Sequence, residues 1–218
     1  MRLGQHGPLI AAALTDLSRA HADKKRFLDI GCGGGNRTVL FEGPGREIHG
    51  FDAKDWREPA LKDRIAFRLG DMMTEPLPYP DGFFDLVFSF DVFEHVPHPE
   101  RIMSEAKRVL APGGVFLLST PNKWRPAGVL LIPLGLRRFP APIHPASIGW
   151  PYPVHIMEYT AGELAAFGAA AGFELRRMHR LFYGLTSRLG IDRLGLMPMC
   201  HNLLAEYRVP ERPAAAHG

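Results

Sequence analysis

A short apolar segment that ends in a cluster of glycines constrains this chain more than any other feature. Residues 27–35 read FLDIGCGGG, a run of strand-forming residues followed at once by a glycine-rich turn. A buried parallel strand that turns sharply into a helix has this pattern. Glycine permits positive φ and close approach to a ligand, and the following helix N-terminus presents free N–H groups. The segment predicts a cofactor site of the nucleotide type; a tight strand–helix corner without a ligand is the alternative.

The spacing of the glycines argues against a dinucleotide. A dinucleotide fingerprint has glycines at its first, third and sixth positions, and the sixth position counted from Gly31 is Asn36. Asp29 lies just before the turn, where its carboxylate would repel a pyrophosphate and attract an ammonium group. S-adenosylmethionine (SAM) carries an ammonium group and a sulfonium and has no phosphate, so the turn favours SAM over a nicotinamide dinucleotide.

Two further predicted strands end in acidic residues. Residues 47–52 end in Asp52, at the offset of about 20 residues from the turn at which an acid binds ribose hydroxyls. Residues 65–69 are followed by Gly70 and Asp71, whose carboxylate can accept a hydrogen bond from an adenine amino group. Each acid alone is compatible with a solvated strand end. Together the three acids are expected at the carboxyl edge of one sheet, where open α/β sheets bind ligands.

In this order the segments resemble the class I SAM-dependent methyltransferases, most closely the small single-domain group that includes the ubiquinone-biosynthesis methyltransferases. The resemblance covers residues 27–173. Its further segments are LPYPDGFFD at 77–85, FEHV at 93–96, LAPGG at 110–114 and HIMEYT at 155–160. One departure is the short stretch between Asn36 and Arg46, which contains Gly-Pro-Gly and predicts a stunted first helix.

The resemblance implies which residues bind the cofactor. The glycine turn would hold the methionine part of SAM, Asp52 the ribose hydroxyls, and Asp71 with Met72 the adenine. Phe90 and Asp91, at the end of the fourth strand, would flank the site of methyl transfer. The full set of predicted cofactor contacts is Asp29, Gly31, Cys32, Gly33, Asp52, Ala53, Asp71, Met72 and Phe90. Cys32 is expected to be a small residue that fits the turn.

Strands that alternate with helical segments predict a parallel sheet covered on both faces. We expect an α/β, Rossmann-like, doubly wound and mainly parallel sheet of seven strands, with an antiparallel last strand and helices on both faces. Strands are expected at 26–30, 46–51, 65–69, 84–90, 114–119, 173–181 and near 201–209, and helices at 8–20, 35–40, 55–62, 98–110 and 160–171. Thr160 and Glu163 match a capping box at the start of the last helix.

We expect one domain over residues 1–209 and a flexible tail at 210–218. Residues 121–155 contain eight prolines and an apolar patch at 128–136, so we interpret them as a lid-like insertion. A chain of 218 residues can form one sizeable core.

Composition limits the location and the partners. The two cysteines lie far apart in sequence and give no disulfide framework, so we predict a cytoplasmic protein without a secretory signal. No apolar run reaches the roughly 20 residues of a membrane span. The net charge of +3 and the lack of an interleaved basic and aromatic patch predict no nucleic-acid partner. The ten histidines are scattered, so no metal is expected. The oligomeric state stays open.

A sulfonium is an activated methyl donor, so the protein has to align the acceptor, exclude water and remove a proton if the acceptor is a hydroxyl. His95 and His155 are the candidate bases, because a histidine titrates near neutral pH. Asp91 is a candidate for orienting either histidine or an acceptor hydroxyl. The alternative for each histidine is a structural role.

The leading prediction is methyl transfer from SAM to a small-molecule acceptor, at an oxygen atom. The apolar and basic composition of the lid favours a lipid-like or glycan-linked metabolite, with Arg137 and Arg138 facing a negative group. Two alternatives stay open. One is a nicotinamide-dependent reductase of the Rossmann type. The other is a membrane-surface binding module with a vestigial cofactor site, in which the apolar patch of the lid makes peripheral contact with lipid.

Overall fold

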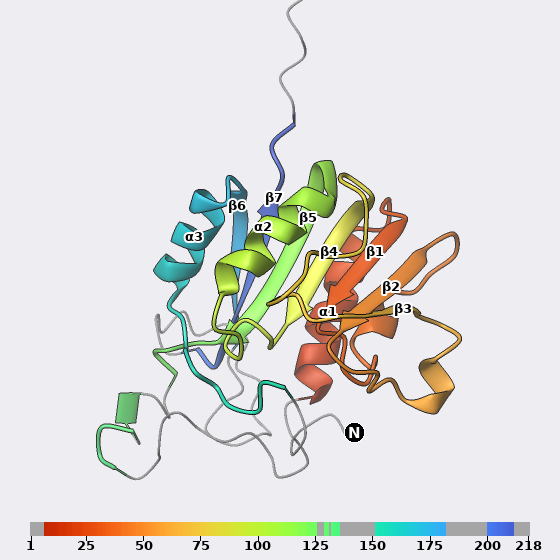
Figure 1. Cartoon of the computed structure of the whole chain (residues 1–218). Helices are drawn as coiled ribbons and strands as arrows, with labels where there is room; N and C mark the ends of the chain where they lie inside the picture. Colours follow the sequence, from red (N-terminus) through yellow and green to blue (C-terminus); the bar gives the residue numbers. More distant parts are fainter. Residues whose placement is uncertain (1–6, 126–128, 131, 136–150, 182–199, 212–218) are drawn as a thin grey trace, which may run out of the picture.

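A computed structural model describes residues 7–125, 129–130, 132–135, 151–181 and 200–211, and they form one seven-stranded sheet (Figure 1). The strand order is β3-β2-β1-β4-β5-β7-β6. The strands are β1 (Arg26–Ile30), β2 (Glu47–Asp52), β3 (Ala66–Leu69), β4 (Phe84–Phe90), β5 (Leu110–Pro121), β6 (Glu174–Leu181) and β7 (Asn202–Arg208). The expected fold class, a Rossmann-like doubly wound sheet, is confirmed.

The order of the strands reverses between β1 and β4, and this reversal determines where a ligand binds. Strands β1 to β5 pair in parallel, while β7 pairs antiparallel with both β5 and β6. The predicted antiparallel pair of last strands is therefore present, with β6 at the outer edge. Ligands of doubly wound sheets bind at the carboxyl ends of the strands where the order reverses, so the tips of β1 and β4 mark the expected site.

Helices cover both faces of the sheet. Figure 1 shows α2 (Pro99–Val109) and α3 (Ala161–Ala170) on one face and α1 (Gly7–Ala20) on the other. On the α1 side, Phe41 packs on Phe88 with ring centroids 4.4 Å apart. On the α2 side, Ile102 is fully buried in the larger of the two core clusters. Each face thus has its own apolar core, and the strand tips stay available at the edge.

The connections after β1 and β2 are less helical than expected. The predicted helix at 35–40 is a short 3₁₀ helix, η1 (Thr38–Phe41), as the stunted stretch implied. The predicted helix at 55–62 is wrong, because only η2 (Pro59–Leu61) forms there. Glu58 precedes a proline and takes an extended ψ of 140°, as pre-proline residues do. Arg57 then donates to the carbonyls of Lys62 and Ile65, both at 2.9 Å, in place of helical hydrogen bonds.

In its described parts, the chain after β5 lies beside the segment that leads into α3, and the lid-like role of residues 121–155 stays a prediction. Strand β5 runs from Leu110 to Pro121 and is longer than the predicted 114–119. Asn122 forms a parallel bridge with Tyr159, so the end of β5 lies beside the segment that leads into α3. The predicted capping box of Thr160 and Glu163 is present at the start of α3. Arg137 and Arg138, and residues 128, 131 and 136 of the apolar patch, lie outside the described residues.

Among the residues that the structure describes, no helix is long and apolar enough to cross a membrane.

Candidate active site

A cleft of about 550 Å³ opens at the carboxyl ends of the central strands. Its volume lies in the usual range of small-molecule sites. All twelve predicted site residues line it, namely Asp29, Gly31, Cys32, Gly33, Asp52, Ala53, Asp71, Met72, Phe90, Asp91, His95 and His155. The fold therefore brings together side chains that are up to 126 positions apart in sequence (155 − 29). Which atoms of a ligand each of them contacts stays a prediction.

The glycine turn after β1 has a backbone that only glycine adopts easily. Gly31 has a φ of 77°, and its N–H donates to the carbonyl of Phe51 at 2.8 Å. A Cβ at this position would lie 2.3 Å from a methyl carbon of Val92, far inside van der Waals contact. Gly31 thus lets the turn pass close to the tip of β4, which keeps the floor of the cleft open.

Asp52 at the tip of β2 fastens this turn. Its Oδ2 accepts a hydrogen bond from the N–H of Gly33 at 2.8 Å. Burial raises the pKa of the Asp52 carboxyl. The carboxylate that is predicted to bind ribose hydroxyls is therefore also part of the turn that is predicted to hold the methionine part of SAM.

Asp29 at the end of β1 is buried beneath the turn. The hydroxyl of Thr38 donates to its Oδ2 at 2.6 Å. Burial raises the pKa of Asp29 to about 7, so a cationic ligand group close by would favour its ionised form.

Asp71, beyond the tip of β3, contacts a residue that the sequence did not single out. Tyr152 donates from its hydroxyl to Asp71 Oδ2 at 2.9 Å, while the N–H of Met73 donates to Oδ1, also at 2.9 Å. Tyr152 belongs to the segment that leads into α3 and also lines the cleft. This segment therefore reaches the predicted adenine end of the site, and only the fold could reveal the contact.

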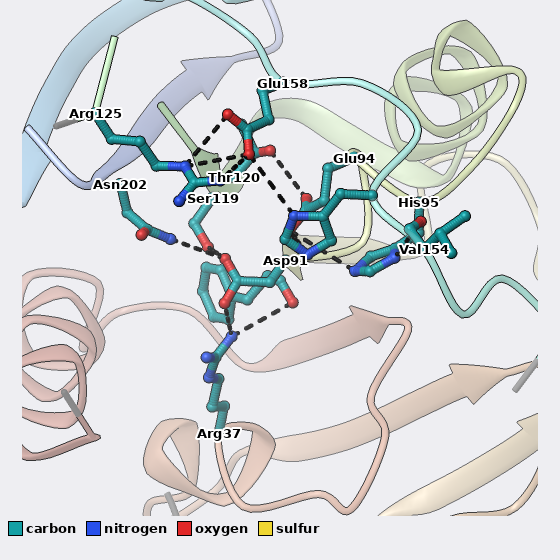
Figure 2. A network of polar contacts seen from close by, with 12 residues as sticks. Arg37, Asp91, Glu94, His95, Ser119, Thr120, Arg125, Val154, Glu158 and Asn202 are labelled. Atoms are coloured by element: carbon teal, nitrogen blue, oxygen red, sulfur yellow. Dashed lines mark hydrogen bonds and ion pairs between the residues drawn. The ribbon is translucent and has the colours of Figure 1, made fainter. Parts of the chain in front are cut away.

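Asp91, directly after β4, is the centre of a polar network (Figure 2). Its φ of 57° is the only positive value among the described non-glycine residues. Its carboxylate accepts hydrogen bonds from Arg37 at 2.7 Å and from Ser119 and Asn202, both at 3.1 Å. Asp91 thus joins the segment after the glycine turn to β5 and β7, so a structural role stands beside its predicted role of orienting a histidine.

The two predicted histidines meet beside a buried glutamate. The rings of His95 and His155 lie edge to face with centroids 4.6 Å apart. Glu94 Oε1 lies 3.9 Å from His95 Nε2 and 4.0 Å from His155 Nε2. Glu94 is fully buried, and its other oxygen accepts a hydrogen bond from Thr120 at 2.9 Å. The histidines are scattered in the sequence and Glu94 belongs there only to the FEHV segment, yet the fold places Glu94, His95 and His155 together.

Burial dominates the electrostatics of this cluster. Burial, followed by the charge of Asp91, raises the pKa of Glu94 well above its ordinary value. Burial, followed by the proximity of His155, lowers the pKa of His95 to about 4. Both shifts favour neutral side chains, so His95 presents a free lone pair at neutral pH.

The donor set of the cleft fits SAM better than it fits a dinucleotide. Three carboxyl groups at strand tips, those of Asp29, Asp52 and Asp71, line one cleft. They suit a ligand with an ammonium group and ribose hydroxyls, and they would repel a pyrophosphate. Arg37, a cation at the glycine turn, is paired with Asp91.

Comparison with known proteins agrees with this interpretation. A family model described as a methyltransferase domain matches residues 4–177. A probable S-adenosylmethionine-dependent methyltransferase of Mycolicibacterium smegmatis is 32% identical over 160 residues, which cover 72% of this chain and 55% of that protein. A ubiquinone biosynthesis O-methyltransferase of Aeromonas salmonicida is 29% identical over 172 residues, 73% of this chain and 67% of the relative. The chain spans about half or less of several other curated relatives, such as 30% of a probable tocopherol O-methyltransferase of rice.

Solved structures share the fold. A SAM-dependent methyltransferase from Archaeoglobus fulgidus has a TM-score of 0.67 at 16% identity, with 92% of this chain and 93% of that chain covered. The 1,6-didemethyltoxoflavin-N1-methyltransferase of Burkholderia thailandensis, solved with S-adenosylhomocysteine, has a TM-score of 0.62 at 18% identity, with coverage of 92% and 78%. At these identities the likeness concerns the fold.

Proposed function

Because this chain belongs to the methyltransferase family whose domain model matches residues 4–177, and is a SAM-dependent methyltransferase, we propose that it methylates an oxygen atom of a small-molecule acceptor. Family membership decides against the nicotinamide-dependent reductase. The acceptor and the methylated atom belong to the proposal, since the names of the relatives include oxygen, nitrogen and carbon methylation.

The residues of the glycine turn and the strand tips have the task of binding and alignment. SAM supplies a methyl group that is already activated on a sulfonium. Asp52, with its link to Gly33, is suited to bind the ribose, and Asp29 is suited to attract the ammonium group. Holding both reactants in one orientation removes much of the entropic barrier to transfer. These side chains therefore act through geometry and need no covalent intermediate.

The observation that carries the choice of oxygen is the cluster of Glu94, His95 and His155 at the cleft. A hydroxyl acceptor has to lose its proton, and assistance with that loss is worth about 10²–10⁴-fold in rate. The cluster lies beyond the tip of β4 in the cleft that the strand-tip acids also line. Nitrogen and carbon acceptors with a free lone pair or a nucleophilic double bond have less need of such groups.

Exposed apolar side chains support a lipid-like acceptor. Five of the seven exposed large hydrophobic residues in the described chain lie between residues 124 and 157, namely Trp124, Leu130, Leu134, Ile156 and Met157. This stretch follows β5 and leads into the segment that carries His155. Exposed apolar side chains that gather on one surface are typical of ligand or membrane contact, and these five lie close together in the sequence. We propose that this stretch contacts the apolar part of the acceptor, at a membrane surface or in solution. A glycan-linked acceptor would leave these side chains without a partner.

Transfer of labelled methyl groups tests the acceptor. The protein is incubated with SAM carrying an isotopic label in the methyl group and with matched phenol, amine and prenyl-phenol acceptors. We expect a labelled methyl ether, with a higher kcat/KM for the prenylated phenol. Label on nitrogen or carbon would contradict the proposal. A double alanine substitution of Arg137 and Arg138 tests for a negative group on the acceptor, because an unchanged acceptor KM would rule that group out.

A liposome flotation assay tests the membrane contact. Leu130→Asp with Leu134→Asp should reduce flotation, while Leu69→Asp, an exposed leucine in β3 outside this stretch, should not. A folded protein that floats and binds no S-adenosylhomocysteine would instead be the membrane module with a vestigial cofactor site.

A further inference from the structure

Three side chains capable of binding a metal converge at the cleft. One ligand atom each from Glu94, His95 and His155 lies within 4.8 Å of the other two. Glu94 Oε1 is buried and has no hydrogen-bond partner in the described chain. The two histidine Nε2 atoms lie 3.9 and 4.0 Å from it, too far for a hydrogen bond. A buried carboxyl oxygen without a hydrogen-bond partner is disfavoured, so a positively charged partner at the centre of the cluster would stabilise it.

The orientation of His95 is fixed in the way that metal ligands require. Its Nδ1 lies 3.0 Å from the carbonyl oxygen of Val154. A carbonyl only accepts hydrogen bonds, so Nδ1 carries the hydrogen and Nε2 presents its lone pair toward Glu94. A histidine that binds a metal almost always donates its other N–H to a carbonyl or carboxylate in this manner.

His155 has a carboxylate behind it. Its Nδ1 lies 3.9 Å from Glu158 Oε1, on the side of the ring away from the Nε2 that faces Glu94. Glu158 is itself held by Arg125, whose Nε donates to Oε1 at 3.1 Å (Figure 2). At this distance Nδ1 makes no hydrogen bond to Glu158 or to any other described residue, so the carboxylate would have to move closer to complete the carboxylate–histidine–metal arrangement that is common around zinc.

The backbone keeps the two histidines together. The N–H groups of Ile156 and Met157 donate to the carbonyl oxygen of Glu94 at 2.9 and 3.3 Å. The segment that bears His155 is therefore attached to the residue next to His95. The positions of the three ligands depend on main-chain contacts as well as on flexible side chains.

From these contacts we propose that Glu94, His95 and His155 form a binding site for one divalent transition-metal ion. Ligands around zinc at 2.0–2.2 Å are about 3.3–3.6 Å apart, so the three atoms, now 3.9 to 4.8 Å apart, would have to close by roughly 0.3 to 1.5 Å. Two imidazoles and one carboxylate suit Zn²⁺, Fe²⁺ or Mn²⁺, whereas Mg²⁺ and Ca²⁺ prefer oxygen ligands. Three protein ligands leave coordination positions open toward the cleft that His95 and His155 line.

The role of the ion toward the acceptor rests on the proposed function; the site itself does not. An acceptor hydroxyl bound to the ion loses its proton to water more easily, because a divalent ion stabilises the oxyanion. The oxygen then forms a bond to the methyl carbon as the bond from that carbon to sulfur breaks, and the sulfonium becomes a neutral thioether. The transfer consumes no oxidant or reductant, and the ion keeps its charge.

Zinc titration of the whole chain tests the site. The protein is freed of metal with a chelator and titrated with Zn²⁺ by isothermal calorimetry. We expect one equivalent to bind with micromolar or tighter affinity. His95→Ala and His155→Ala should each weaken this binding by about 100-fold or more, since loss of outer contacts alone costs 10–100-fold. His98→Ala is the matched control, because His98 is exposed in the same loop and should leave the affinity unchanged.

S-adenosylhomocysteine binding is measured on the same samples, as a check of folding and of the proposed function. Retained binding by both histidine variants, together with lost zinc binding, supports the metal site. The proposal is overturned if the unaltered protein binds no zinc tighter than about 100 μM, or if both histidine variants bind it as well as the unaltered protein does. A protein that binds zinc but no S-adenosylhomocysteine would refute the proposed function alone.

Discussion

The guanidinium of Arg37 donates to the carboxylate of Asp91 across 2.7 Å, and this ion pair joins the segment after the glycine turn to the tip of β4. Both side chains are less than a third exposed. We expect Arg37→Met to lower the free energy of unfolding by about 1–3 kcal/mol, because it leaves a half-buried carboxylate without its cation. Urea denaturation measures the change. Arg64→Met, which breaks a more exposed pair with Glu42, should lower the free energy of unfolding by less; equal losses would contradict the prediction.

Gly31→Ala should reduce stability and cofactor binding by more than the strain of a positive φ alone would. An alanine there suffers the backbone strain of φ 77° and also a contact of 2.3 Å with Val92. Gly45 has a similar φ of 71° with nothing within 4 Å of a Cβ, so Gly45→Ala is the matched control. We expect the control to lose about 1–2 kcal/mol of stability, and Gly31→Ala to lose more and also to lose S-adenosylhomocysteine binding. Similar binding by the two variants would show that the turn has room to move.

Asp52→Asn tests the predicted contact with ribose. The amide oxygen of asparagine can still accept the hydrogen bond from Gly33, so the turn should stay folded. Loss of the charge should weaken S-adenosylhomocysteine binding by about 1.5–3 kcal/mol, roughly 10- to 150-fold. Asp81→Asn, which touches Arg108 outside the cleft, is the control for the same chemical change. Unchanged affinity in a folded Asp52→Asn variant would remove this carboxylate from the cofactor site.

The buried Asp29 predicts a pH dependence of stability. Its pKa in the folded state is about 7, above the ordinary value of 3.8, because burial disfavours the charge. The folded protein therefore binds this proton more tightly than the unfolded chain, and the contribution is complete below about pH 4 and is lost as the pH rises to 7. Relative to Asp29→Asn, the unaltered protein should lose up to about 1.4 kcal/mol per pH unit over that range. Urea denaturation of both proteins at several pH values measures the difference, and a constant difference would refute it.

Tyr152→Phe should loosen the predicted adenine end of the site. The substitution removes the hydroxyl that donates to Asp71 at 2.9 Å and keeps the ring. One neutral donor to a carboxylate is worth about 1–2 kcal/mol, so the KM for SAM should rise about 5- to 30-fold. Tyr79→Phe removes a buried hydroxyl that has no hydrogen-bond partner in the described chain and should leave this KM unchanged. Equal KM values for the two variants would show that Tyr152 has no part in cofactor binding.

Local patterns in the sequence were enough to predict the sheet and the turn. The apolar run that ends at Gly31 and the acids at Asp29 and Asp52 are each readable within a few residues, because strands and tight turns depend on neighbouring positions. The helix at 55–62 was predicted wrongly because helix propensity alone does not take account of two residues within that segment. Pro59 keeps the preceding residue in an extended conformation, and the side chain of Arg57 donates to the carbonyls of Lys62 and Ile65 in place of backbone N–H groups.

The polar contacts of the site depend on distance in space, and the sequence does not encode them locally. Arg37 meets Asp91 across 54 positions, and Tyr152 meets Asp71 across 81. Glu94 is the sequence neighbour of His95, but its burial could not be predicted, because a glutamate in a loop after a strand is usually solvated. Only the parallel sheet and the backbone contacts of Ile156 make Glu94 a buried member of the cluster.

The stretch from Tyr152 to Met157 holds the predicted adenine end through Asp71 and the acceptor end through the carbonyl of Glu94. We expect a movement of this segment that breaks the contact of Tyr152 with Asp71 to disturb its hydrogen bonds to Glu94 as well. We therefore expect departure of the spent nucleoside and entry of the next acceptor to be coupled, so that binding and release follow a fixed order.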